Sequence, residues 1–517
     1  MVLVILNSAK NTPLKPAFLD VLDDVGIKRE TSLTGAAWSD FDNDGFLDLL
    51  ITGNKITLYR NKGNGTFADV TEKTGILSEP TMSGVFGDYD NDGCRDIYIV
   101  GHGGYRRDHL YHSNCDGTFA DVSDTAKIKI DSNYGYGTAW ADYDNDRYLD
   151  LYIASYGNFK VSDTNELLYT DEPNVLYRNN RDGTFTDVTN KAGVSGMTNC
   201  RALARSLLIG SLPKEWPYKK SYQPIWFDYN NDGKIDLFIS TDAGISPLYR
   251  NNGDSTFTEV TKEAGLCRAG TGMGVTVGDY DNDGNIDVYV TNVGANYLWH
   301  NNGNGTFSDV GAELEVAHPL TLGWGTGFFD YDNDGNLDLY AVNGTVLLRD
   351  GINNPEIGKV MLDKLYKNNG DGTFREVAAS EGIIGDYSKE AAAFGDYDND
   401  GFTDAFVATS YFTRDFRSHL YKNQGNRNHW ITIQLVGIKS NRDSVGARIT
   451  LTANGKTQIR EIASGSSFIS QNSLWQTFGL GKTKMIDKIE IRWPSGIKKV
   501  LKNIRTDQKI IVTEESN

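Results

Sequence analysis

The fold of this chain is decided by one nine-residue stretch, Asp40-Phe41-Asp42-Asn43-Asp44-Gly45-Phe46-Leu47-Asp48. It has the form D-x-D-x-D-G-x-x-D. Hard divalent cations prefer several oxygen ligands at short range, and alternating carboxylates supply them. The glycine permits the positive φ of a sharp turn, so the loop can fold around an ion. The chain contains seven such acid loops, and the other six begin at Asp88, Asp142, Asp228, Asp279, Asp330 and Asp396.

One copy would be ordinary turn chemistry, but seven copies in one pattern predict calcium binding, with up to seven Ca²⁺. Asn230 replaces a third-position acid and Arg147 replaces a sixth-position glycine, so we expect weaker binding in the fourth and third loops. The predicted ligands are, at the first position, Asp40, Asp88, Asp142, Asp228, Asp279, Asp330 and Asp396; at the third, Asp42, Asp90, Asp144, Asn230, Asp281, Asp332 and Asp398; at the fifth, Asp44, Asp92, Asp146, Asp232, Asp283, Asp334 and Asp400; and at the ninth, Asp48, Asp96, Asp150, Asp236, Asp287, Asp338 and Asp404.

The negative charge of the chain is concentrated in these loops. The 517 residues carry a formal net charge of -18, from 69 acidic side chains against 51 Lys and Arg. The loops hold 27 of the acids, so the remaining 42 leave the rest of the chain net positive by 9, and seven Ca²⁺ would bring the whole to -4. The excess of acidic residues therefore serves mainly as metal ligands. Because the chain is acidic overall, we expect no broad nucleic-acid-binding surface.

The sequence around each loop predicts four antiparallel strands per repeat. A β-rich run such as Leu49-Leu50-Ile51 follows the loop, and a second run ends in Leu58-Tyr59-Arg60-Asn61 or a close variant. A Gly-rich turn and a strand such as residues 66–70 come next, and the strand before the loop is the fourth. Repeats begin mostly 48 to 66 residues apart. Four-stranded units at roughly 40–50 residues are typical of a β-propeller, so we predict an all-β, seven-bladed ring.

The pattern also predicts how the ring closes. The Thr-Phe-x-Asp/Glu-Val strand is missing after the seventh repeat, and its counterpart, residues 17–21, precedes the first loop. We therefore expect the first strand to complete the last blade. The interval from Asp142 to Asp228 is 86 residues long and contains two insertions, near residues 155–173 and 190–224. Residues 201–208 could form a short helix there, and a degenerate eighth blade is the rival interpretation.

The repeat pattern ends near residue 426. Strand-like runs follow, such as residues 430–435 and 488–493, with turns at Asn454-Gly455 and Pro494-Ser495-Gly496. We predict a propeller domain over residues 1–425 and a small β module over residues 426–517. Cys94, Cys115, Cys200 and Cys267 have no metal-ligand spacing; we expect free buried thiols, with a Cys94–Cys115 disulfide as the alternative.

These motifs resemble a known combination of domains. The acid-loop repeats resemble FG-GAP (VCBS-type) calcium propellers related to integrin α-chain repeats, and the tail resembles the ASPIC/UnbV domain, through Gly446-Ala447-Arg448, Phe478-Gly479-Leu480-Gly481 and Trp493-Pro494-Ser495-Gly496. Together they are similar to the CRTAC1-like family, named for a cartilage acidic protein. The resemblance implies a calcium-binding, interaction-competent protein, mostly secreted, without well-defined chemistry.

Strand order assigns the connections to two ends of the ring. The acid loops and tight Gly turns share one end, called here the acid-loop end. The opposite end, called the long-loop end, receives the insertions near residues 101–108, 155–173, 190–224, 343–363 and 409–418. Long loops on a rigid scaffold often carry binding or catalysis. The candidate catalytic residues there are Arg106, Arg107, Tyr411, Arg414 and Asp415.

Two functions are compatible with this layout. The first is a calcium-stabilised binding module whose long-loop end binds a protein or glycan, with the ions in a structural rather than a regulatory role. The second is an enzyme of specialised metabolism, of an alkylation or cyclisation type, acting on a small-molecule substrate at the channel mouth. The chain has no G-x-S-x-G, H-E-x-x-H or P-loop motif, so we prefer the binding module.

The compartment is less well defined by the sequence. Calcium sites and the family resemblance favour an extracellular or periplasmic location. The apolar run at residues 2–6 is shorter than the roughly 7–15-residue core of a signal peptide, so no leader is visible. No run approaches the roughly 18 apolar residues of a transmembrane helix, and we expect no membrane span.

Overall fold

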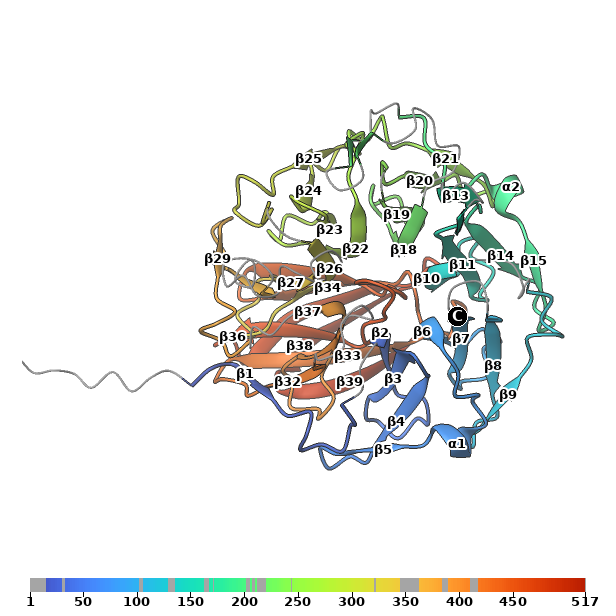
Figure 1. The fold of residues 1–517 in the computed structure, drawn as a ribbon. Coiled ribbons are helices and arrows are strands. Elements are labelled where there is room, and N and C mark those ends of the chain that lie inside the picture. Colours follow the sequence, from blue (N-terminus) through green and yellow to red (C-terminus); the bar gives the residue numbers. More distant parts are fainter. Residues whose placement is uncertain are drawn as a thin grey trace, which may run out of the picture.

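A computed structural model provides the structure of the chain. It describes residues 15–29, 33–101, 106–128, 135–161, 167–170, 172–200, 205–206, 210–211, 220–242, 244–319, 322–344, 362–383, 389–409 and 417–516. Seven four-stranded antiparallel sheets form a ring, and a smaller β module packs against it (Figure 1). The prediction of an all-β, seven-bladed propeller is confirmed.

Six of the seven blades each take their four strands from one stretch of the chain around one acid loop, and in the third blade a separate hairpin stands between the second and third strands. The first three are β2 (Leu33–Ser39), β3 (Asp48–Gly53), β4 (Thr57–Asn61) and β5 (Phe67–Asp69); β6 (Thr81–Gly87), β7 (Asp96–Gly101), β8 (His109–Ser113) and β9 (Phe119–Asp121); and β10 (Gly135–Ala141), β11 (Asp150–Ser155), β14 (Val175–Asn179) and β15 (Phe185–Asp187). The next three are β18 (Lys220–Phe227), β19 (Asp236–Asp242), β20 (Leu248–Asn251) and β21 (Phe257–Glu259); β22 (Gly272–Gly278), β23 (Asp287–Asn292), β24 (Tyr297–Asn301) and β25 (Phe307–Asp309); and β26 (Leu322–Phe329), β27 (Asp338–Gly344), β28 (Lys364–Asn368) and β29 (Phe374–Glu376).

The seventh blade takes its outer strand from the start of the chain. It contains β30 (Lys389–Gly395), β31 (Asp404–Thr409), β32 (His419–Asn423) and β1 (Phe18–Asp20). Phe18 lies opposite Asn423 and Asp20 opposite Tyr421 in an antiparallel pair. The ring is therefore closed by strands from the two ends of the propeller sequence, which leaves no unpaired edge between first and last blade.

The first strand of each blade lines the centre of the ring, where it contacts the first strands of both neighbouring blades. Crowding there explains the small residues in these strands. A Cβ on Gly274 would lie 2.3 Å from the Trp324 carbonyl oxygen, and one on Gly35 would lie 2.1 Å from that of Ile469. Only glycine permits such close backbone approach.

The two insertions between the third and fourth acid loops carry short hairpins. The first contains β12 (Asn158–Val161) paired with β13 (Leu167–Thr170), and the second contains β16 (Arg205–Ser206) paired with β17 (Gly210–Ser211). The predicted helix over residues 201–208 is wrong at Arg205 and Ser206; its other residues lie outside the described part. A helix this short is marginal without packing, whereas a hairpin pairs its backbone locally. The helices α1 (Thr71–Thr74) and α2 (Thr189–Ala192) are single turns after outer strands.

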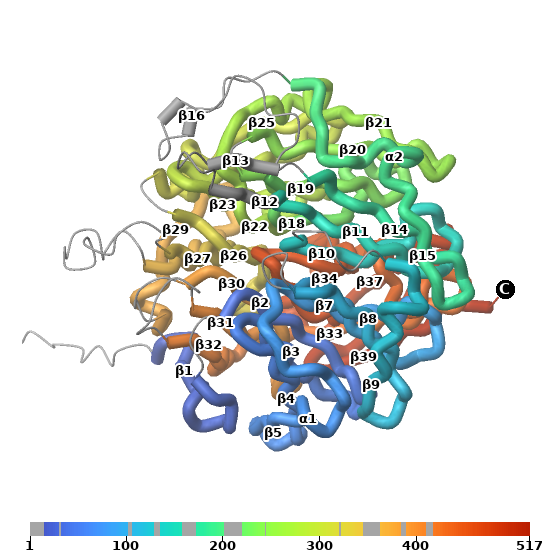
Figure 2. Tube along the Cα trace, turned by 45° about the vertical axis from the view of Figure 1, so that its right-hand side comes forward, coloured from blue at the N-terminus to red at the C-terminus, as the bar shows by residue number. Residues whose placement is uncertain are grey.

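The C-terminal module contains two sheets. One is β36 (Gln476–Gly481), β33 (His429–Val436) and β39 (Gln508–Thr513); the other is β35 (Lys456–Glu461), β34 (Arg448–Ala453), β37 (Met485–Arg492) and β38 (Lys498–Arg505). Figures 1 and 2 show these orange and red strands on one side of the ring. Contacts such as the one from Asp88 N–H to Asp443 Oδ2, at 2.8 Å, identify that side as the acid-loop end.

Residues 464–473, called here the channel plug, extend from the module into the centre of the ring. Ser467 exchanges two backbone hydrogen bonds with Val275 in the fifth blade, both 2.8 Å long. The Gln471 side chain binds the backbone of Phe86 in the second blade, accepting at 2.7 Å and donating at 3.0 Å. The plug also contacts the first, third, fourth, sixth and seventh blades through Ala36, Trp140, Tyr222, Thr326 and Phe394.

The prediction of free buried thiols is wrong. Cys94 is bonded to Cys115, and Cys200 is bonded to Cys267, with Cα atoms 5.5 Å and 5.6 Å apart. The first pair joins an acid loop to the turn after β8 in the same blade. The second joins the connections that follow β15 and β21, from neighbouring blades. A separation of 67 residues hid this second pair, because only the ring brings successive inter-blade connections together.

Candidate metal centres

The first acid loop folds around its own carboxylates. Gly45 has a φ of 90°, and its N–H donates to Asp40 Oδ2 at 3.0 Å. Phe46 N–H donates to Asp44 Oδ1, also at 3.0 Å. One carboxylate oxygen each from Asp40, Asp42 and Asp48 lies within 4.8 Å of the others. The backbone turn therefore gathers oxygen donors from distinct positions of the loop around one point.

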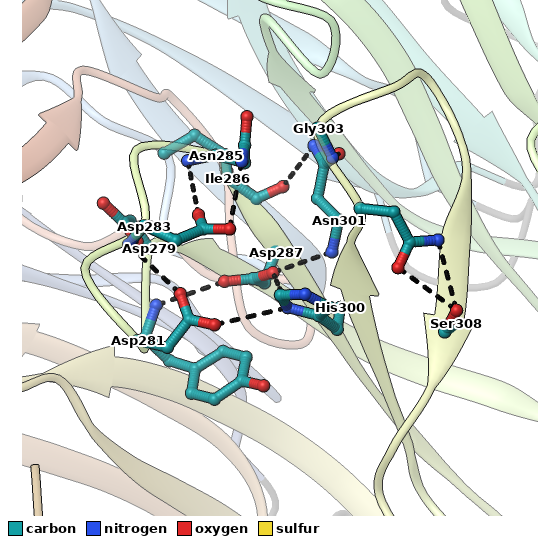
Figure 3. Close-up of polar contacts among 12 residues, drawn as sticks. Asp279, Asp281, Asp283, Asn285, Ile286, Asp287, His300, Asn301, Gly303 and Ser308 are labelled. Carbon is teal, nitrogen blue, oxygen red and sulfur yellow. Dashed lines mark hydrogen bonds and ion pairs between the residues drawn. The ribbon is translucent and has the colours of Figure 1, made fainter. Parts of the chain in front are cut away.

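The ninth-position aspartate is buried in all seven loops. Asp48 Oδ2 accepts the N–H of Phe41 at 3.0 Å, and its Oδ1 accepts the N–H of Asn61 at the end of β4 at 2.7 Å. The same pair of backbone hydrogen bonds recurs in the other six blades. Figure 3 shows the fifth loop, where Asp287 lies between Asn301 and the other acids. This aspartate connects the loop to the third strand of its blade.

Burial makes the ionised loops unfavourable without a counter-ion. It raises the pKa of Asp48 to about 9 and that of Asp40 to about 6, and nearby acids add to both shifts. In the second and third loops burial likewise raises the pKa of Asp88 to about 8 and that of Asp142 to about 7. A bound cation would stabilise the charged forms.

Several carboxylate oxygens also lack a partner. Oδ1 is buried without a hydrogen bond in Asp40, Asp88, Asp144, Asp332 and Asp398. Such orphaned acceptors are costly unless a donor or a metal satisfies them. Hard, closely spaced oxygen donors fit Ca²⁺, so the aspartates at the first, third, fifth and ninth positions would hold the ion. When bound, calcium would supply positive charge and cross-link the loop.

A basic side chain from the third strand faces most loops. Arg60 pairs with Asp42 and Asp44, and Lys367 pairs with Asp332 and Asp334. In the third and seventh blades Arg178 and Lys422 occupy the same position. The corresponding residues of the second and fifth blades are His112 and His300. One such cation offsets only part of the charge of three or four carboxylates.

The two irregular loops keep the shared backbone path. Arg147 adopts a φ of 84°, close to the 90° of Gly45, and its N–H still donates to Asp142 Oδ2 at 3.0 Å. Asn230 accepts the N–H of Asp232 at 3.1 Å, as the third-position aspartates of the first, second and fifth loops do. The turn is therefore retained at a conformational cost in one loop and with one less charge in the other. Whether these two loops bind calcium more weakly stays a prediction.

A set of contacts between neighbouring loops was not anticipated. The fourth-position asparagine has positive φ in all seven loops. In five of them its side-chain amide donates to a backbone carbonyl of the next loop: Asn43 to Gly93, Asn91 to Arg147, Asn282 to Gly335, Asn333 to Gly401 and Asn399 to Gly45. The constant asparagine in the repeat was the available signal, but its partner could be identified only from the ring.

The module supplies further groups to the loops. Arg492 donates to Asp228 Oδ2 at 2.8 Å, and Glu461 Oε2 accepts the Asp228 N–H at 3.0 Å. Arg95, Asp88 and Asp443 form a similar group at the second loop. These acid loops are therefore contacted by a second domain.

The long-loop end is only partly described. Arg106 lies 3.8 Å from Glu79, and Arg107 pairs with Asp124. Tyr411, Arg414 and Asp415 lie outside the described residues. Only Arg106 and Arg107 of the five candidate catalytic residues are described, so catalysis at this end stays a prediction.

Two families match the chain. The FG-GAP-like repeat matches residues 40–99, 88–153, 228–290, 281–341 and 353–407, and ASPIC and UnbV matches residues 437–517. Cartilage acidic protein 1 of Homo sapiens is 24% identical over 391 residues, which are 74% of this chain and 53% of that protein. The Mus musculus protein of the same name is 24% identical over 512 residues, which are 93% of this chain and 73% of that protein. The chain thus spans about half the length of the human relative.

Solved structures resemble the chain more distantly. An Agrocybe aegerita lectin that recognises non-reducing terminal N-acetylglucosamine has a TM-score of 0.38 and 16% identity, over 74% of this chain and 87% of that one. Sqt1 of Saccharomyces cerevisiae has a TM-score of 0.41 and 10% identity, over 80% of this chain and 100% of that one. Among the described residues, no helix is long and apolar enough to cross a membrane.

Proposed function

The chain belongs to the FG-GAP-like repeat family, and from this premise we propose that it is a calcium-stabilised propeller that binds an extracellular protein through its long-loop end. The observation that carries the proposal is the position of the module. Its strands cover the acid-loop end, and its plug contacts all seven blades inside the channel. Among the described residues, these module contacts lie at the acid-loop end and in the channel, which favours the long-loop end as the surface for a partner.

Three observations support a structural role for calcium. The acid loops recur in every blade, the ninth-position aspartates are buried, and five loops contain buried carboxylate oxygens without a hydrogen bond. Each loop joins the first two strands of its blade and contacts the third. An ion at this point would neutralise crowded acids and hold three strands of one sheet together.

An extracellular location is supported by independent features. Disulfides persist in oxidising compartments, and the described cysteines form two. The relatives are named for cartilage, a tissue rich in extracellular matrix. A matrix protein is therefore the kind of partner we propose.

The experiment compares binding at the two ends of the ring. The full chain would be tested by surface plasmon resonance against purified extracellular-matrix proteins, in calcium and after chelation. We expect calcium-dependent binding to at least one of them, weakened about tenfold or more by Arg106→Glu, whose side chain is 51% exposed at the long-loop end. Lys62→Glu, exposed in a turn at the acid-loop end, is the matched control and should bind normally.

Two results would contradict the proposal. Equal loss of binding in both variants would indicate general charge attraction rather than recognition by one end. If chelation lowered the melting temperature but left binding unchanged, binding would not depend on the calcium-stabilised fold.

A further inference from the structure

The second and fifth acid loops differ from the others in the residue that faces them. In the first, third, sixth and seventh blades, the third strand places a cation beside the acid loop: Arg60, Arg178, Lys367 and Lys422, respectively. These charged side chains have no lone pair to offer a metal ion. The second and fifth loops face His112 and His300 instead. A neutral imidazole has a lone pair, so these two loops combine nitrogen and oxygen donors.

In both loops the imidazole nitrogen points at the carboxylates. His112 Nδ1 lies 3.2 Å from Asp96 Oδ1 and 3.3 Å from Asp90 Oδ2. His300 Nδ1 lies 3.3 Å from Asp287 Oδ1 and 3.4 Å from Asp281 Oδ2, and Figure 3 shows this convergence. When two donor atoms each lie about 2.1 Å from one ion, and the donor–ion–donor angle is between 90° and tetrahedral, the two donors are roughly 3.0 to 3.4 Å apart. The observed separations fall in this range.

These contacts differ from the other histidine–carboxylate pairs of the chain. His109 lies 2.8 Å from both Asp121 and Glu79, and His429 lies 2.7 Å from Asp507. Those are the distances of charge-assisted hydrogen bonds. His112 Nδ1 and His300 Nδ1, by contrast, are buried and make no hydrogen bond. Their ion-pair contacts of 3.2 to 3.4 Å are longer than those hydrogen bonds, and this spacing also suits donors around a shared ion.

Neighbouring groups complete the donor sets. Oxygens of Asp90 and Asp92 lie within 4.8 Å of each other and of the His112 nitrogen, as do those of Asp281 and Asp287 with His300. In the second loop the fully buried Asp88 also carries an Oδ1 without a hydrogen bond. Imidazole suits zinc, copper, iron and nickel, whereas Ca²⁺ takes oxygen ligands.

We propose that the second and fifth loops bind a divalent transition-metal ion of the zinc and cobalt class through His112 and His300. The five loops without a histidine are then calcium sites, so the ring carries two kinds of metal centre: transition-metal sites in blades two and five, and calcium sites in the other five blades. This assignment goes beyond the proposed function: it replaces calcium by a transition-metal ion in two of the seven loops, and it leaves the calcium-stabilised ring and its partner binding as proposed above.

The test measures zinc retained by the full-length protein. Metal-free protein would be dialysed against Zn²⁺ in a large excess of Ca²⁺, and bound zinc would be counted by mass spectrometry. We expect two zinc ions per chain in the wild type, one in His112→Arg or His300→Arg, and none in the double variant. Loading with Co²⁺ should give a visible absorption spectrum that changes in step with these losses. The arginine variants copy the residue of the first and third blades, so folding should be preserved and a melting curve in calcium checks it.

His429→Gln is the matched control. It removes an imidazole that pairs with a carboxylate outside the acid loops and should retain two zinc ions. Zinc that is displaced by calcium, or retained equally by the double variant, would overturn the assignment. The histidines would then act as protonated counter-ions, like the Arg and Lys of the other blades.

Discussion

Asn399 in the seventh blade donates a hydrogen bond from its side-chain amide to the carbonyl oxygen of Gly45 in the first blade, 3.0 Å away. The two residues are far apart in the sequence, and their contact joins the last acid loop to the first. With β1 completing the seventh blade, it closes the ring at a second place.

Replacing Asn399 by glycine should lower the free energy of unfolding by about 1 kcal/mol. Glycine keeps the positive φ of 57° and removes only the amide, so the change isolates the hydrogen bond. Urea unfolding at saturating calcium would measure it. Asn145→Gly is the control: Asn145 has the same backbone conformation, and the described chain offers its side chain no partner. Equal effects of both changes would contradict a role for the contact.

Calcium removal should lower the melting temperature by on the order of 10 °C. The reason is that each site stabilises the folded state by about 2.7 kcal/mol when calcium is present at a hundredfold its dissociation constant. Scanning calorimetry with calcium and with chelator would measure the difference. Magnesium in place of calcium is the control, because these closely packed oxygen donors suit the larger ion. An unchanged melting temperature would rule out structural ions.

The contacts of Asp20, in the strand that closes the ring, should make the free energy of unfolding depend on pH. Burial opposes its ionisation, but contacts with His419 and Arg29 prevail and lower its pKa to about 2. A carboxyl whose folded pKa is depressed stabilises the fold above its unfolded pKa of about 3.9, and this contribution is lost as the pH falls toward 2. Asp20→Asn should therefore cost about 1 kcal/mol at pH 7 after solvent screening, and the difference should shrink below pH 4.

Denaturant titrations of both proteins between pH 2.5 and 7 would measure this difference. Asp23→Asn is the control, because Asp23 contacts the same arginine from an exposed position. A deficit of Asp20→Asn that stays constant across this range would exclude the charged pair as its cause.

Phe468 should be the side chain that holds the plug most strongly. It is 2% exposed, and its ring lies 5.2 Å from that of Tyr222 and 4.9 Å from that of Trp324. Phe468→Ala should cost about 3–5 kcal/mol, while Phe468→Leu should cost less than about 1.5 kcal/mol. Equilibrium unfolding would separate the two. Similar small losses in both variants would show that the plug is held by its backbone contacts instead.

Arg147→Gly should stabilise the protein by about 1 kcal/mol, because arginine at a φ of 84° is strained and glycine is not. The reverse change, Gly45→Arg, should destabilise it by a similar amount. A Cβ at Gly45 would meet no atom within 4 Å, so the Cβ itself adds no steric clash to the conformational cost. Melting temperatures at saturating calcium would measure both. The two substitutions should change the melting temperature in opposite directions. If Arg147→Gly lowered it instead, the arginine side chain would have a stabilising role of its own.

Much of the architecture could be predicted because it depends on short sequence segments that are repeated along the chain. A nine-residue loop with its glycine and the strands beside it recurs seven times, so strand order, blade number and the strand that completes the last blade followed from spacing. The ligand positions could be predicted for the same reason, since alternating carboxylates and a left-handed turn are properties of one short segment. Local periodicity was sufficient for these features.

The sequence alone determined the ring, its acid loops and the chemistry of their ligands; the tertiary structure decided which distant groups meet at them. The Cys200–Cys267 bond, the Asn399–Gly45 contact and the approach of Arg492 to Asp228 join segments with no local pattern in common. The plug is a short polar run whose partners lie in seven blades. Such pairings depend on ring curvature and on the docking of one domain on another, and neither is encoded in the spacing of a repeat.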